Sequence, residues 1–109
     1  MAAATMPPVI ASYFAAQNQH DTSAMLACFS AEAVVNDEGR DRRGLAAIRE
    51  WMAETTRKYR VHTEVLKGGG TPTTWTATVR LTGTFPGSPI EVPYRFSLKG
   101  GKIASLQID

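Results

Sequence analysis

The chain has 109 residues, of which 43% are hydrophobic and 20% charged, and its formal net charge at pH 7 is +2. This length accommodates one domain with a modest core, and the composition excludes a disordered or fibrous protein. The small charge does not indicate nucleic-acid binding, and we interpret the basic clusters at 40–43 and 57–60 as solvated surface. Cys28 is the only cysteine, which excludes an internal disulfide and favours the reducing cytoplasm.

The first eight residues, MAAATMPP, contain no lysine or arginine and no long apolar run. They therefore resemble neither a secretory signal nor a transmembrane segment. We expect residues 1–8 to be a flexible tail and residues 9–109 to form a single cytoplasmic domain that has no contact with a membrane.

Two helices are predicted at the start of this domain. The proline pair at 7–8 can open a helix, and apolar residues then recur at helical spacing from Val9 to Phe14. After the polar run at 17–20, Asp21 is placed to cap a second, short helix.

A short strand and a third helix are predicted next. The β-branched segment 33–37 is typical of a strand that ends at Asp37, and the polar stretch 38–44 is typical of a turn. From Leu45, apolar residues repeat every three or four positions, which predicts an amphipathic helix to about Lys58.

The second half of the chain changes to an alternation with a period of two, which is typical of strands. Four strands are predicted, at about 60–67, 74–82, 90–98 and 103–108, and a tight turn joins the last two. Helices first and strands last predict an α+β fold, with a curved antiparallel sheet around three helices. The threonine face of the strand at 74–82 is either solvated or a dimer surface, and we favour a homodimer through the sheet.

This order of elements resembles the cone of the NTF2-like superfamily, and particular residues strengthen the resemblance. Residues 9–54 are similar to the N-terminal half of the SnoaL-like and ketosteroid-isomerase-like proteins; they read VIASYFAAQNQHDTSAMLACFSAEAVVNDEGRDRRGLAAIREWMAE. The Gly-x-x-Ala-Ile-Arg motif at 44–49 is common to the superfamily, so it identifies the fold better than the chemistry. The resemblance implies a pocket for a small apolar molecule and no cofactor.

The resemblance also implies three catalytic positions. Asp37 falls where similar isomerases carry their general-base aspartate, and Tyr13 falls where they carry the tyrosine that donates to the oxyanion. Tyr94 falls near the position of a second donor, a protonated aspartate; this departure leaves a hydrogen-bond donor but argues against a faithful steroid isomerase. Such chemistry needs a carboxylate beside an apolar cavity and a preorganised donor for the enolate oxygen.

Each of these residues also has a structural interpretation. Asp37 can simply begin a turn, and Tyr13 can pack in the core with its hydroxyl at the rim. Phe14, Trp51 and Phe96 are predicted to form part of the pocket wall, although aromatic residues in so small a domain mostly fill the core.

Three functions remain compatible with the sequence, and it does not decide whether the chain is an enzyme. The leading hypothesis is an isomerase or cyclase that moves a proton on a small hydrophobic carbonyl compound, with Asp37 as base and Tyr13 holding the enolate. The alternative is a non-catalytic ligand-binding or dimerisation module. An epoxide hydrolase is weaker, because that chemistry needs converging aspartates and the four strands predicted in the second half carry none except Asp109 at the terminus. His20 and His62 lack carboxylates at ligand spacing, so no metal site is predicted.

Overall fold

The structure is a computed structural model, and it describes residues 6–108. Within this range three helices and six strands follow one another: α1 (Pro8–Asn18), α2 (Thr22–Leu26), β1 (Phe29–Asp37), β2 (Arg40–Arg43), α3 (Gly44–Tyr59), β3 (His62–Gly70), β4 (Thr74–Thr82), β5 (Ile90–Lys99) and β6 (Lys102–Ile108). Residues 1–5 of the predicted tail lie outside the described residues, whereas Met6 packs against the core and Pro8 already belongs to α1. None of the described helices is long and apolar enough to cross a membrane.

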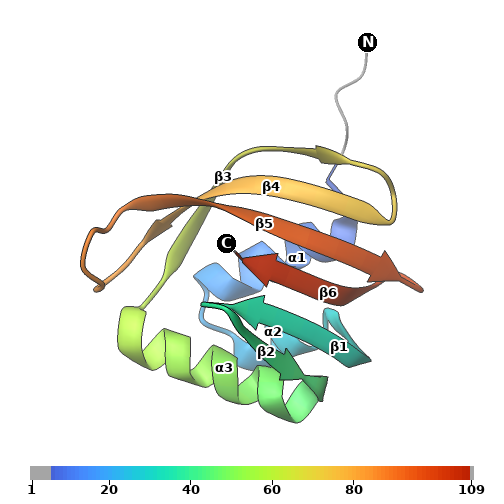
Figure 1. Cartoon of the computed structure of the whole chain (residues 1–109), viewed down its shortest axis with the longest axis horizontal. Coiled ribbons are helices and arrows are strands. Elements are labelled where there is room, and N and C mark those ends of the chain that lie inside the picture. Colours follow the sequence, from blue (N-terminus) through green and yellow to red (C-terminus); the bar gives the residue numbers. More distant parts are fainter. Residues whose placement is uncertain (1–5, 109) are drawn as a thin grey trace.

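The six strands form one curved sheet in the order β2-β1-β6-β5-β4-β3 (Figure 1). Neighbouring strands are antiparallel except β1 and β6, which run parallel. Helix α1 contacts both β3 and β6, and α3 covers β1 and β2. This arrangement confirms the predicted α+β cone.

Several local predictions are confirmed. Asp21 caps α2 by accepting a hydrogen bond from the backbone N–H of Ala24 at 3.0 Å. In β4 the residues Trp75, Ala77 and Val79 are buried, as their alternation predicts. Each of these features depends on a few adjacent residues, so it can be predicted from the sequence alone.

The segment 29–43 differs from the prediction. The first strand begins at Phe29 rather than at 33, and the expected turn at 38–44 contains a further strand, β2. Strand β2 reads Arg-Asp-Arg-Arg and pairs with β1 at the edge of the sheet. An edge strand made of charged residues has no apolar alternation by which it could be recognised.

Asn18, the last residue of α1, connects the helix through hydrogen bonds to β3, which lies at the edge of the sheet. Its Nδ2 donates to the carbonyl oxygen of Thr63 at 2.9 Å, and its Oδ1 accepts from the backbone N–H of Thr63 at 2.8 Å. The side-chain amide thereby forms the two bonds that a neighbouring strand would supply at this position. These bonds fix the end of α1 against β3.

Candidate functional site

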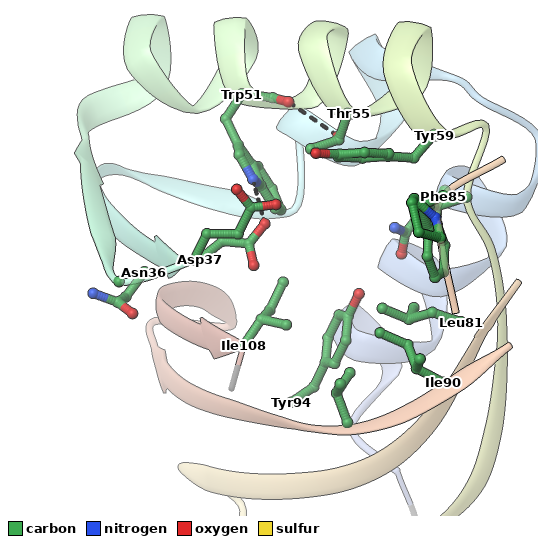
Figure 2. Close-up of a pocket in the computed structure, with 16 residues that line it drawn as sticks. Asn36, Asp37, Trp51, Thr55, Tyr59, Leu81, Phe85, Ile90, Tyr94 and Ile108 are labelled. Carbon is green, nitrogen blue, oxygen red and sulfur yellow. Dashed lines mark hydrogen bonds between the residues drawn. The ribbon is translucent and has the colours of Figure 1, made fainter. Parts of the chain in front are cut away.

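A cavity of about 470 Å³ lies between the end of β1, helix α3 and the strands β4 and β5. Figure 2 shows Trp51, Thr55 and Tyr59 reaching into it from α3, while Leu81, Ile90 and Tyr94 reach into it from the sheet. Most of the wall is apolar, and polar groups come from the end of β1 and the turn after it, from Tyr94 in β5, and from the helices, which supply Gln17, Thr55 and Tyr59. A mainly apolar cavity with a few converging polar groups is the usual form of a small-molecule site.

Three residues from three adjacent strands form the floor of this site. Asp37 in β1 pairs with Ile108 in β6, and Ile108 pairs on its other side with Tyr94 in β5. Side chains in register across neighbouring strands point to the same face of a sheet, so all three line the cavity. Since neighbouring strands lie about 4.8 Å apart, Asp37 and Tyr94 flank Ile108 with their Cα atoms about 10 Å from each other.

The carboxylate of Asp37 is held by an indole. Trp51 Nε1 donates to its Oδ2 at 2.9 Å (Figure 2). The guanidinium of Arg42 donates instead to the backbone carbonyl of Asp37, at 2.8 Å, and within residues 6–108 no basic side chain forms an ion pair with this carboxylate. The Asp37 carboxyl group therefore faces a mainly apolar cavity with an indole N–H, not a cation, as its hydrogen-bond partner.

The phenol of Tyr94 is the second polar group that faces the cavity. Its side chain is buried, and its hydroxyl points into the cavity (Figure 2). Burial raises the pKa of Tyr94 well above the ordinary value of a phenol, a hydrogen bond from the side chain of Gln17 opposes this effect, and the charge of Asp37 adds to it. Tyr94 thus remains a neutral hydrogen-bond donor at physiological pH.

Tyr13 lies behind this site and does not line the cavity. Its hydroxyl is buried and has no hydrogen-bond partner among the described residues, and it faces a second, very small cavity. Burial raises the pKa of Tyr13 far above its usual range, and Tyr94 and Asp37 add smaller contributions of the same sign. The structure therefore brings Asp37 and Tyr94 to one cavity and leaves Tyr13 in the core beside it.

Of the three residues predicted to form the pocket wall, one lines the cavity and two lie in the core behind it. Trp51 lines the cavity, whereas Phe14 and Phe96 belong to a buried aromatic cluster. In this cluster the ring of Phe14 lies 5.5 Å from that of Tyr94, and the rings of Tyr13 and Phe96 are 6.0 Å apart, measured between ring centroids. Phe14 and Phe96 therefore support Tyr94 from behind.

The loop between β4 and β5 forms one rim of the cavity. Thr84 donates its backbone N–H to the carbonyl oxygen of Tyr59 at 2.7 Å, and the rings of Tyr59 and Phe85 meet edge to face at 5.9 Å. Gly83 lies so close to the end of α3 that a Cβ atom there would collide with the Tyr59 carbonyl oxygen. The loop and the helix end thus form one continuous wall.

Comparison with known proteins identifies the family. The model of the SnoaL-like domain matches residues 10–106, nearly the whole chain. The chain belongs to the SnoaL-like family. None of the curated proteins matches this sequence.

Solved structures agree with membership of the SnoaL-like family. A proposed polyketide cyclase from Sinorhizobium meliloti is 33% identical with a TM-score of 0.93, over 95% of each chain. A protein with a ketosteroid isomerase-like fold from Catenulispora acidiphila, solved in complex with trimethylamine, is 24% identical with a TM-score of 0.83, over 96% of this chain and 86% of that chain. A proposed polyketide cyclase from Xanthomonas campestris is 20% identical with a TM-score of 0.81, over 92% and 85% of the two chains. The last two likenesses show the fold alone.

Several cavity residues of this SnoaL-like domain were not predicted. Gln17 and Thr55 are polar residues on the inner faces of α1 and α3, and a polar group at a helical core position is a signal that could have identified them. Phe85 stands in the Gly- and Pro-containing loop 83–89, where an aromatic residue outside a predicted strand is an equally readable signal. Among the described residues no group of three His, Cys, Asp or Glu side chains could hold a metal ion.

The two buried phenols predict how stability depends on alkaline pH. Their pKa values are raised in the folded state, so the folded chain keeps two protons that the unfolded chain loses above about pH 10. The stability they contribute is complete below that pH and is lost as the pH rises. In urea denaturation we expect the free energy of unfolding to fall by about 1 kcal/mol for each phenol between about pH 9 and 11.

Tyr13→Phe provides the control, because it removes a buried hydroxyl that has no partner among the described residues and leaves the ring in place. The loss between the same two pH values should shrink by about 1 kcal/mol in this variant. An identical pH dependence in the wild type and in Tyr13→Phe would contradict the expectation.

Proposed function

We propose that this SnoaL-like domain is an isomerase or cyclase that moves a proton on a small hydrophobic carbonyl compound. The observation that supports this function is the placement of the Asp37 carboxylate and the Tyr94 hydroxyl in one apolar cavity, on either side of Ile108. A base and a hydrogen-bond donor separated by an apolar side chain are suited to a substrate whose acidic C–H and carbonyl oxygen lie at neighbouring positions.

In the proposed reaction Asp37 removes a proton from the carbon next to the carbonyl, and the electron pair moves onto the oxygen. The resulting enolate oxygen accepts a hydrogen bond from Tyr94, which the protein has already oriented. In an isomerisation Asp37 returns the same proton to a different carbon. In a cyclisation the enolate carbon attacks a second carbonyl of the same molecule, and the new alkoxide takes the proton from Asp37. Both balance without a further reactant.

The two tyrosines receive different roles in this proposal. The resemblance to isomerases makes Tyr13 the oxyanion donor and Tyr94 the second one. Because Tyr94 faces the cavity and Tyr13 lies behind it, we assign the direct hydrogen bond to Tyr94 and a supporting position to Tyr13.

The first test is deuterium exchange at the acidic CH₂ of the apolar ketone 2-tetralone in D₂O, followed by proton NMR. Asp37→Asn should lower the catalysed rate at least about a thousandfold, because an amide cannot act as the base. Tyr94→Phe should lower it about a hundredfold, the usual cost of one oxyanion donor, and Tyr13→Phe less than about threefold.

Asp41→Asn is the matched control, because Asp41 is a nearby carboxylate in β2 that does not line the cavity. Its rate should equal that of the wild type. Exchange at the wild-type rate in Asp37→Asn would refute the proposed base. A loss in Tyr13→Phe as large as that in Tyr94→Phe would return the donor role to Tyr13.

A second candidate function is the binding of a small organic amine without catalysis. The charged residues that line the cavity, Asp37 and Glu38, are both acidic, and no Lys, Arg or His from the described part of the chain lines it. Aromatic rings from Trp51, Tyr59 and Tyr94 complete a surface of the kind that binds ammonium groups. The trimethylamine in the Catenulispora protein is consistent with such a ligand.

Calorimetry can distinguish this candidate from proton transfer. Tetramethylammonium chloride should bind the wild type and Asp41→Asn, and Asp37→Asn should weaken that binding about tenfold because it removes the charge. The neutral analogue tert-butanol should bind more weakly than the cation. Equal binding of cation and alcohol, or no binding of the cation above a sodium chloride control, would exclude the amine function.

We also propose that two copies pair through the outer face of the sheet. This face carries exposed Thr76 and the ion pairs of Arg80 with Glu64 and Glu91, so it is polar rather than apolar. Sedimentation should give twice the mass of one chain, and Thr76→Glu should give a monomer because it adds charge at the centre. Ser23→Glu, on exposed α2, should remain a dimer. A monomeric wild type would refute the pairing.

A further inference from the structure

The contact between Trp51 and Asp37 joins the middle of α3 to the end of β1. Its donor and acceptor, Nε1 and Oδ2, are 2.9 Å apart, and the indole is almost fully buried between the main cavity and the small one beside Tyr13. The backbone of Trp51 lies within helix α3, where its carbonyl oxygen accepts a hydrogen bond from Thr55 Oγ1 at 3.0 Å. Because the ring is buried by close packing, it has little freedom to move away.

An indole N–H can only donate, so Trp51 must be the donor of this hydrogen bond and Asp37 the acceptor. The bond occupies Oδ2 of Asp37, and Oδ1 accepts no hydrogen bond from a described side chain. The backbone of Asp37 is fixed independently, because it pairs with Arg40 on one side and with Ile108 on the other. Only the side-chain torsions of Asp37 remain to be set, and the bond from Trp51 sets them.

We propose that Trp51 is a positioning residue, which holds Oδ2 of Asp37 so that Oδ1 is the oxygen presented to the ligand. This inference rests on the proposed function, in which Asp37 is the base. It differs from the role of Trp51 as cavity wall, because it depends on one N–H group rather than on the area of the ring. If Asp37 is wrongly oriented, the rate of proton transfer should fall while the affinity for the ligand stays the same, since binding depends on the apolar wall.

The first test observes the bond itself, in the full chain labelled with ¹⁵N. The protein has two tryptophans, so its spectrum contains two indole N–H signals, and Trp51→Phe and Trp75→Phe assign them. The Trp51 signal should shift in Asp37→Asn, which changes the acceptor of its hydrogen bond, and the Trp75 signal should not, because its Nε1 has no partner among the described residues. An unresponsive Trp51 signal would refute the inference.

Other titratable or charged groups surround Asp37, and they require a control. They are Glu38 in the β1-β2 turn, Arg42 in β2, Tyr94 in β5 and Tyr13 in α1. Of these only Glu38 is also a carboxylate that lines the cavity, so Glu38→Gln is the matched control. The Trp51 signal should keep its wild-type position in Glu38→Gln and shift in Asp37→Asn. An equal shift in both variants would show that the contact with Asp37 does not cause it and would refute the inference.

The second test measures deuterium exchange of 2-tetralone in Trp51→Phe, which keeps a ring in the wall but removes the N–H. We expect kcat to fall about ten- to a hundredfold while KM changes less than about twofold. Loss of packing alone would weaken substrate binding and would therefore raise KM.

Trp75→Phe is the matched control, because it shrinks a buried indole that does not line this cavity. Its kcat and KM should match those of the wild type. A wild-type kcat in Trp51→Phe, while Asp37→Asn is inactive, would refute only the positioning role. A wild-type rate in Asp37→Asn would refute the proposed function, and the indole signal would still report whether the hydrogen bond exists.

Discussion

Strands β1 and β6 run parallel, and this pairing joins the two halves of the chain into one site. It places Asp37, the last residue of β1, beside Ile108, whose other neighbour is Tyr94. A carboxylate from the N-terminal half and a phenol from the C-terminal half thereby point into the same cavity. If β1 were shifted by one residue along β6, Asp37 would point to the opposite face of the sheet, so register determines the chemistry as much as residue identity does.

Two polar groups of the cavity, the Asp37 carboxyl and the Tyr94 phenol, are held as a hydrogen-bond acceptor and a hydrogen-bond donor by different interactions. Asp37 is stabilised as an acceptor by the Trp51 indole, while Tyr94 is kept as a neutral donor by burial within the aromatic cluster. A ligand that offers a donor or an acidic C–H at one end and an acceptor at the other matches this pattern.

The sequence predicted features that depend on a few adjacent residues and missed those that depend on distant ones. The cap formed by Asp21 and the buried alternation of β4 were predicted correctly because each is encoded locally. Strand β2 carries no apolar signal, and its existence follows from pairing with β1. Periodicity also identified the inner faces of α1 and β5, but it does not show which inner residue meets a cavity and which meets another ring. For that reason Phe14 and Phe96 were placed at the pocket wall, while the loop residue Phe85 was missed.

The close approach of Gly83 to the end of α3 limits which substitutions at the rim can change the shape of the cavity. The rim is held by a main-chain contact between residues 84 and 59, whereas the Phe85 side chain that reaches the cavity is bound by no hydrogen bond. Exchange of that side chain alters the volume and shape offered to a ligand without disturbing the contact that closes the wall. Gly83 tolerates no such exchange, because any Cβ there meets the carbonyl oxygen. A substitution of Phe85 can therefore change the shape of this entrance, whereas a substitution of Gly83 would first have to move the loop away from the end of α3.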